Sequence, residues 1–291
     1  MAGVELGYLA PHPWIMVAGE REEGLYVRTT SAFRQATGEI ERLGLELLVV
    51  ASPHWTPAPI NRIGGAHRYA GTLDRFLPHV NEGLPPGHRR DLPPVPYDFP
   101  GEPALAARLC EAGREMGLPV KLATEAEALD HGSIVPVMYL NPNGRIPVIL
   151  LSIEDGPAER SRRWGEVAGL EVKRAGHRAA FIASGTLSHH FIFDHPNALW
   201  EPGRSWDERL LAQLTGGKAE DVFGYSEEEI AAGELERGGL HGLFMLLGAL
   251  GPNPRATVLS YEGIVGVGSP IVRFQPALRR VPARPQTTGP S

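Results

Sequence analysis

Short apolar runs alternate along the chain with longer segments in which apolar residues recur at helical spacing. The runs at 4–10, 46–52 and 179–184 end at small residues and turn signals, which is typical of buried strands. Further strands are predicted at 120–123, 146–152, 256–261 and 270–275. Helices are predicted at 31–44, 103–117, 158–175, 205–215, 226–232 and 239–250. This alternation predicts an α/β fold with a mostly parallel central sheet flanked by helices.

Glycine and proline, 35 and 27 of 291 residues, gather in long connections such as 78–103 and 199–205. Connections of this length within a compact domain are usually functional loops. We therefore expect a single α/β catalytic domain over residues 1–278, whose long loop insertions cover the carboxyl edge of the sheet. The polar, proline-rich stretch at 279–291 is expected to be a mobile tail.

Charge and composition exclude several classes of protein. The formal net charge of −6 provides no basic surface for nucleic acid or for an anionic membrane. No apolar stretch approaches about 18 residues, and the N-terminus lacks a signal-peptide pattern, so a cytoplasmic location is expected. The single cysteine, Cys110, excludes an intramolecular disulfide and a zinc cluster built from cysteines. Any bound metal must therefore be held by imidazole and carboxylate groups.

Three of the predicted strands are each followed directly by a loop that contains histidine. His12 lies in a Pro-His-Pro sequence, His54 in a Pro-His-Trp sequence, and His189 ends the sequence Ser-Gly-Thr-Leu-Ser-His. If the strands are parallel, these loops meet at the carboxyl edge of the sheet, where open α/β sheets bind ligands. Two imidazoles with one carboxylate suit Fe(II) and also catalytic zinc, so ligand type alone leaves the metal open.

Other side chains near these loops have two interpretations each. Trp55 could form a wall of a pocket or stack on an aromatic substrate, or it could pack beneath its own loop. A histidine that stays unbound beside a metal is suited to moving protons at neutral pH, which is the role we predict for His189. His131, in an Asp-His-Gly sequence, could hydrogen-bond substrate or bound oxygen, or it could be a turn residue.

The motifs together resemble the class III extradiol ring-cleavage dioxygenases, the superfamily that contains protocatechuate 4,5-dioxygenase. The resemblance runs from about residue 6 to residue 274 and rests on the motifs at 11–13, 52–55, 97–103, 129–136, 184–189 and 240–248. The last two resemble in particular the branch that acts on 3,4-dihydroxyphenylacetate.

This resemblance implies a non-haem Fe(II) enzyme that opens a catechol ring with O2, with zinc or manganese as alternative metals. His12 and His54 would be the imidazole ligands. The carboxylate ligand of the family precedes the helix predicted from 239, which makes Glu236 the best-placed candidate and leaves Glu234 and Glu262 as alternatives. A homo-oligomer is also implied.

The remaining roles implied by the resemblance concern proton transfer and substrate. His189 would be the catalytic acid/base, and His131 would steer substrate or oxygen. His241, at the start of the helix after Glu236, would contact an acidic substituent of the substrate or make a structural hydrogen bond. Two rival functions stay open, namely a zinc-dependent hydrolase and a non-catalytic binding protein on the same scaffold.

Overall fold

The computed structural model describes residues 2–14, 16, 24–55, 60–73, 87, 94–125, 129–154, 156–195 and 198–277. The predicted tail at 279–291 and much of the connection at 78–103 lie outside the described residues. The single-domain boundary therefore stays a prediction. Within the described part of the chain, no helix is both long and apolar enough to cross a membrane.

The centre of the fold is an eight-stranded sheet in the order β6-β3-β7-β2-β8-β1-β10-β9. Its strands are β1 (Gly3–Ala10), β2 (Leu47–Ser52), β3 (Asn61–Gly64), β6 (Val120–Ala123), β7 (Val148–Ser152), β8 (Arg178–Ser184), β9 (Arg255–Ile264) and β10 (Val267–Gln275). The four central strands, β7, β2, β8 and β1, are mutually parallel. On one side β3 runs antiparallel to β7, and on the other the β9–β10 hairpin runs antiparallel to β1. The predicted α/β class with a mostly parallel sheet is thus confirmed.

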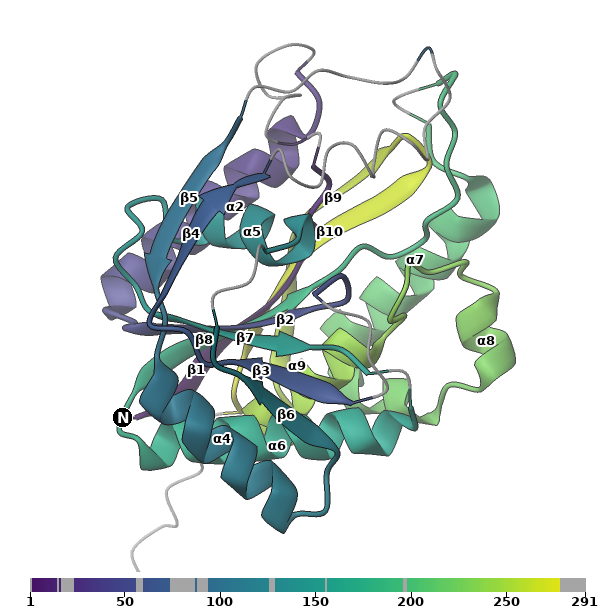
Figure 1. Cartoon of the computed structure of the whole chain (residues 1–291). Coiled ribbons are helices and arrows are strands. Elements are labelled where there is room, and N and C mark those ends of the chain that lie inside the picture. The colour runs from purple at the N-terminus through teal and green to yellow at the C-terminus, as the bar shows by residue number, and fades with distance from the viewer. Residues whose placement is uncertain are drawn as a thin grey trace, which may run out of the picture.

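Helices cover both faces of the sheet, as Figure 1 shows. One face carries α4 (Pro103–Glu115), α6 (Ala158–Arg174), α7 (Glu201–Thr215) and α9 (His241–Leu250), and the other carries α2 (Val27–Leu43) and α5 (His131–Leu140). Because both faces are covered, every residue of β2 and β7 is buried, which explains their continuous apolar sequences.

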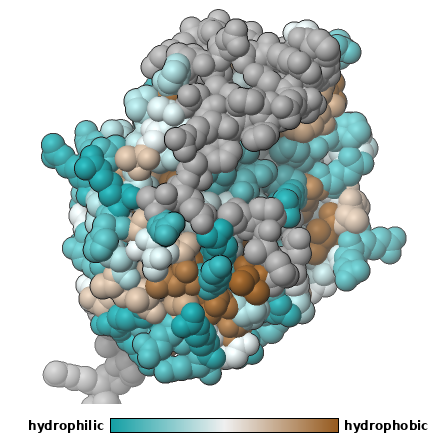
Figure 2. Space-filling view, viewed as in Figure 1, coloured by the Kyte–Doolittle hydropathy of each residue, from teal (hydrophilic) through white to brown (hydrophobic). Residues whose placement is uncertain are grey.

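Smaller elements complete the chain. The short helices η3 (Ala219–Gly224) and α8 (Glu227–Ala231) lie between α7 and α9 in the sequence. The strands β4 (Arg68–Thr72) and β5 (Pro96–Pro100) form a separate two-stranded sheet near α5 (Figure 1). Figure 2 shows mostly hydrophilic residues over the described part of this face, with a smaller hydrophobic group toward its centre.

Helix α5 was not predicted, because its sequence lacks a helical period. Every position from Ile134 to Leu140 is apolar, including Pro136, and most residues of the helix are buried between the sheet and α2. Its start is fixed by Asp130, whose side chain accepts hydrogen bonds from the Ser133 amide at 2.9 Å and from the Ser133 hydroxyl at 2.8 Å. This cap places His131 and Gly132 at the carboxyl edge of the sheet.

Candidate metal centre

The three histidine loops come together because their strands are neighbours. Strand β8 lies between β1 and β2 and is parallel to both. Ala10 pairs with Ser184, and Ala51 pairs with Ala183, so the three strands end at nearly the same level. The loops that carry His12, His54 and His189 therefore leave the sheet side by side.

Three donor atoms from distant parts of the sequence form a small triangle at this edge. The Nε2 atoms of His12 and His54 are 3.1 Å apart. The Oε2 atom of Glu236 lies 3.1 Å from Nε2 of His12 and 3.5 Å from Nε2 of His54. Bonds of about 2.1 Å to one ion at angles of roughly 90–110° place donors about 3.0–3.4 Å apart. The triangle therefore has the size expected for three ligands of one divalent cation.

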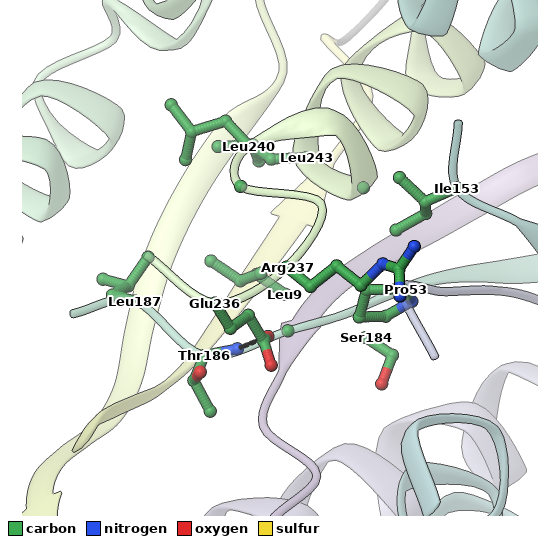
Figure 3. A pocket seen from close by; sticks show the side chains of 13 residues that line it. Leu9, Pro53, Ile153, Ser184, Thr186, Leu187, Glu236, Arg237, Leu240 and Leu243 are labelled. Carbon is green, nitrogen blue, oxygen red and sulfur yellow. Dashed lines mark hydrogen bonds between the residues drawn. The ribbon is translucent and has the colours of Figure 1, made fainter. Parts of the chain in front are cut away.

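The Glu236 carboxylate supports this interpretation. Its Oε2 atom is buried and has no hydrogen bond of normal geometry among the described residues, although two imidazole nitrogens lie close to it. A buried charged oxygen without such a partner is costly unless a cation or a protonated group satisfies it. The other oxygen, Oε1, accepts the Thr186 amide proton at 2.5 Å, as Figure 3 shows. One oxygen is thus held by the chain, and the other faces the two histidines.

The loop before α9 delivers this carboxylate. Gly238 and Gly239 have φ angles of 82° and 46°, and Glu234 has a φ of 45°, which is uncommon for a residue with a side chain. The resulting turn directs Glu236 toward the sheet edge. Glu234 instead contacts Nδ1 of His190 at 2.7 Å from its Oε2 atom.

Glu262, the third candidate, has a different place in the fold. Its Oε2 atom accepts the Thr29 amide proton at 2.7 Å and the Thr29 hydroxyl proton at 2.6 Å. It therefore binds the N-terminal turn of α2, where a carboxylate also interacts favourably with the helix dipole. Of the three candidate carboxylates, the structure brings Glu236 to both histidines.

Hydrogen bonds hold the His12 ring and the backbone of His54 in place. Nδ1 of His12 lies 2.8 Å from the Ser184 hydroxyl, which donates its own proton to the Gly132 carbonyl at 2.5 Å. The amide of His54 donates to Ser52 Oγ at 3.2 Å, and Ser52 in turn donates to Asp130 at 2.7 Å. Supporting hydrogen bonds of this kind commonly orient metal ligands in proteins.

A side chain at position 132 would disturb this arrangement. A Cβ atom on Gly132 would lie 2.6 Å from Ser52 Oγ, 2.9 Å from Asp130 Oδ1 and 3.2 Å from Cδ2 of His54. The close approach of α5 to the loop after β2 thus requires glycine at this position.

The ring of His131 lies against the rings of both His12 and His54. Its ring centroid is 5.2 Å from that of His12 and 4.4 Å from that of His54. Donor atoms of the three rings lie within 4.8 Å of one another, so the three histidines could also hold a metal as a group. The edges of 3.1–3.5 Å to Glu236 make the tighter triangle. Burial, and then the charges of His12 and His54, lower the pKa of His131 well below its ordinary value, which keeps the ring neutral.

His189 is close to the centre but is held by a different partner. Its Nδ1 atom lies 2.9 Å from the Thr186 hydroxyl, and its ring meets Phe191 edge-on at 4.7 Å. Burial lowers the pKa of His189, an effect that the charge of Glu236 opposes and those of His12 and His54 reinforce. A neutral imidazole is therefore the resting form at neutral pH.

The charges at the centre depend on one another. Burial alone would raise the pKa of Glu236, but the imidazoles of His12 and then His54, when they are protonated, hold that pKa well below its ordinary value. Burial would lower the pKa of His54, yet Glu236 and then Asp130 outweigh it and raise the pKa. The site therefore presents an ionised carboxylate to whatever cation it holds.

Two predicted substrate-binding residues lie in other surroundings. Trp55 is only 3% exposed, its ring lies 5.4 Å from the Arg62 guanidinium carbon, and its Nε1 atom has no hydrogen-bond partner among the described residues. The Nδ1 atom of His241 lies 2.9 Å from the hydroxyl of Ser161 on α6. Their roles in substrate binding stay predictions.

A small cavity lies on the α9 side of the Glu236 carboxylate. Figure 3 shows apolar side chains around it, including Leu9, Pro53, Ile153 and Leu240, and the side chain of Arg237 beside Pro53. The hydroxyl residues Ser184 and Thr186 also line it. Sequence reasoning did not single out these two hydroxyls. The partners of Ser184, which are His12 and the Gly132 carbonyl, become its neighbours only through packing, and the pairing of Thr186 with His189 depends on the shape of the loop after β8.

Comparisons with known proteins find relatives over most of the chain. A family model described as the catalytic LigB subunit of aromatic ring-opening dioxygenase matches residues 6–272. The 2-aminophenol 1,6-dioxygenase beta subunit of a Pseudomonas species is 27% identical, with 92% of each chain covered. The 3,4-dihydroxyphenylacetate 2,3-dioxygenase of Escherichia coli is 26% identical, covering 75% of this chain and 78% of that protein. The crystal structure of the uncharacterized protein JW3007 from Escherichia coli K12 matches with a TM-score of 0.65 at 21% identity, covering 92% of this chain and 99% of that one, and so has the same fold.

Proposed function

Because the chain belongs to the LigB family of extradiol ring-opening dioxygenases, we propose that it uses Fe(II) and O2 to cleave a catecholic ring. The observation that supports this proposal most strongly is the triangle formed by His12, His54 and Glu236. Two neutral imidazoles and one carboxylate on one face of a cation are typical of non-haem Fe(II) oxygenases. Zinc and manganese are the alternative metals.

In this proposal, each of the three residues would bind the ion through one atom. His12 and His54 would bind the ion through Nε2, and Glu236 would bind it through Oε2 while the Thr186 amide holds Oε1. When bound, Fe(II) supplies a common binding point for the two ring oxygens and for dioxygen, which places both reactants in one geometry. The buried carboxylate offsets part of the cation's charge.

The neighbouring histidines would handle protons and orientation. His189, neutral at rest and held through Nδ1 by Thr186, is placed to exchange a proton with a phenolic oxygen during ring cleavage. His131, whose lowered pKa keeps it neutral, is suited to donating a hydrogen bond to substrate or oxygen without adding positive charge beside the cation.

The proposed substrate is an aromatic ring with two adjacent oxygen substituents. The relatives are named for 2-aminophenol and for 3,4-dihydroxyphenylacetate, so adjacent polar substituents on one ring are common to both names. A catechol, including one with an acetate side chain, is our first choice, and 2-aminophenol belongs in the test panel. We also propose that the protein is cytoplasmic and forms a homo-oligomer. One relative is named as a beta subunit, so an assembly with a second, different chain is the alternative. Light scattering on the purified protein would show whether it forms an oligomer by itself.

The test is anaerobic reconstitution with Fe(II), followed by oxygen uptake and spectroscopy with catechol, 3,4-dihydroxyphenylacetate and 2-aminophenol. We expect oxygen consumption with at least one catechol and a yellow semialdehyde product from cleavage beside the two hydroxyls. His189→Gln should lower turnover while the iron content stays at the wild-type level. Zinc binding with hydrolase activity and no oxygen uptake would contradict the proposal, as would a folded protein that binds no metal.

A further inference from the structure

Two hydroxyl groups, one at the end of β8 and one in the loop that follows it, each contact one histidine of the centre. Ser184 Oγ lies 2.8 Å from Nδ1 of His12, and Thr186 Oγ1 lies 2.9 Å from Nδ1 of His189. Each contact is a hydrogen bond whose direction depends on where the hydroxyl proton is placed. The other neighbours of each hydroxyl determine whether it donates or accepts, and they differ between Ser184 and Thr186.

The Ser184 hydroxyl has its proton committed elsewhere. It donates to the Gly132 carbonyl at 2.5 Å, so its oxygen can only accept from the imidazole. His12 must therefore carry its proton on Nδ1, which leaves the lone pair of Nε2 directed away from Ser184. This is the tautomer that a metal ligand needs at Nε2.

The Thr186 hydroxyl has no such alternative acceptor among the described residues. Thr186 is 4% exposed, and its hydroxyl has Nδ1 of His189 as its described partner. If Nδ1 carried a proton, the hydroxyl would accept it and keep its own proton without an acceptor in a buried place. If Nδ1 is unprotonated, the hydroxyl donates to it and both groups are satisfied. The cost of an unsatisfied buried donor, about 1–3 kcal/mol, disfavours the first arrangement. The ratio of the two tautomers should therefore favour the second by a factor of roughly 5 to 150.

We propose that Thr186 is a positioning residue that keeps the resting proton of His189 on Nε2. Nε2 has no hydrogen-bond partner among the described residues, so it is the nitrogen left to meet a substrate. The segment 184–186 thus gives two histidines opposite tautomers, one suited to binding a metal and one suited to donating a proton. This inference rests on the proposed acid/base role of His189, and it explains why a histidine so close to the centre is not a ligand.

The backbone of Thr186 separates this role from metal binding. Its amide holds Oε1 of Glu236 at 2.5 Å and does not depend on the side chain. Thr186→Val keeps the shape and the amide but removes the hydroxyl. The substitution should therefore change the proton position on His189 while leaving the carboxylate ligand in place.

The tautomer can be read by two-dimensional 15N NMR of histidine-labelled protein reconstituted with Zn2+ alone, with His189→Gln for assignment. In the wild type we expect the His189 proton on Nε2 and the His12 proton on Nδ1. In Thr186→Val the ratio of Nδ1-protonated to Nε2-protonated His189 should rise by roughly 5- to 150-fold. Thr186→Ser should restore the wild-type ratio.

Thr215→Val is the matched control, because the Thr215 hydroxyl bonds the Leu211 carbonyl within α7. It should leave the His189 signals unchanged, and the zinc content of all variants should equal that of the wild type. A wild-type His189 protonated on Nδ1, or a Thr186→Val spectrum identical to the wild type, would overturn the inference. The wild-type spectrum decides even if Thr186→Val does not fold. The NMR measurement needs no turnover. The tautomer of His189 can therefore be determined even if the protein has no dioxygenase activity.

Discussion

Substitution of Glu236 by glutamine is the most direct test of the metal centre. Glutamine keeps the size of the side chain and an oxygen that can accept the Thr186 amide proton, but it removes the negative charge. The lost Oε2 lies 3.1 Å and 3.5 Å from the two imidazole nitrogens, whereas Glu234 and Glu262 have other partners. The effect should therefore fall on metal binding.

The magnitude follows from the burial of the site. Leaving a buried charge without its partner costs about 3–5 kcal/mol, which corresponds to an affinity loss of roughly 10²- to 10⁴-fold. The metal-free protein should respond differently. There the carboxylate raises the pKa of His54. Once glutamine removes that charge, His54 can release its proton, so no uncompensated charge stays at the site and the free energy of unfolding should change little.

Two other carboxylates provide matched controls in the same assay. Glu234→Gln removes an exposed partner of His190 and should alter metal affinity and stability by less than about 0.5 kcal/mol. Glu262→Gln weakens the bonds to Thr29 at the start of α2 and should lower the free energy of unfolding by about 1 kcal/mol without changing metal affinity.

Metal affinity would be measured by competition with a chromophoric chelator, and stability by urea unfolding in the presence of EDTA. The reasoning is refuted if Glu236→Gln binds zinc or iron as tightly as the wild type. It is equally refuted if Glu234→Gln or Glu262→Gln shows the large loss of affinity instead, because the carboxylate ligand would then come from another position.

Two further predictions concern groups behind the site. Ser184→Ala removes the acceptor for Nδ1 of His12 and should weaken metal binding by about 10- to 100-fold, measured by the same chelator competition with Ser226→Ala as a remote control. Burial raises the pKa of Asp207 to about 6 from 3.8, so the folded state holds this proton more tightly than the unfolded state. The free energy of unfolding should therefore fall by about 3 kcal/mol as pH rises from about 4 to 6, and Asp207→Asn should remove that part of the slope in urea titrations. A slope that is the same in both proteins would contradict the assignment.

The sequence predicted the parallel core and the placing of the histidine loops for a physical reason. Strands β1, β2 and β8 are buried on both faces, so their sequences are continuous apolar runs whose ends are easily recognised. Parallel neighbours then bring the following loops to one edge. This argument alone predicts that His12, His54 and His189 lie together.

Other parts of the site depend on tertiary packing that a sequence pattern does not contain. The choice of Glu236 among three acidic residues depends on a turn that includes two glycines with positive φ. The partners Ser184 and Thr186 act through contacts across 172 residues and 50 residues of sequence, respectively. Helix α5 has no polar face to reveal its period. Short strands such as β3 and β4 likewise carry too few residues for a pattern.

The three donors of the proposed metal centre come from the loop after β1, the loop after β2 and the segment just before α9. No partly folded chain that lacks the C-terminal third can assemble all three. A cation that binds at a thousand times its dissociation constant therefore stabilises the completed fold by about 4 kcal/mol and any earlier intermediate hardly at all. Metal binding would therefore stabilise only the fully folded chain. The difference in melting temperature with and without the ion would measure whether the three loops have come together.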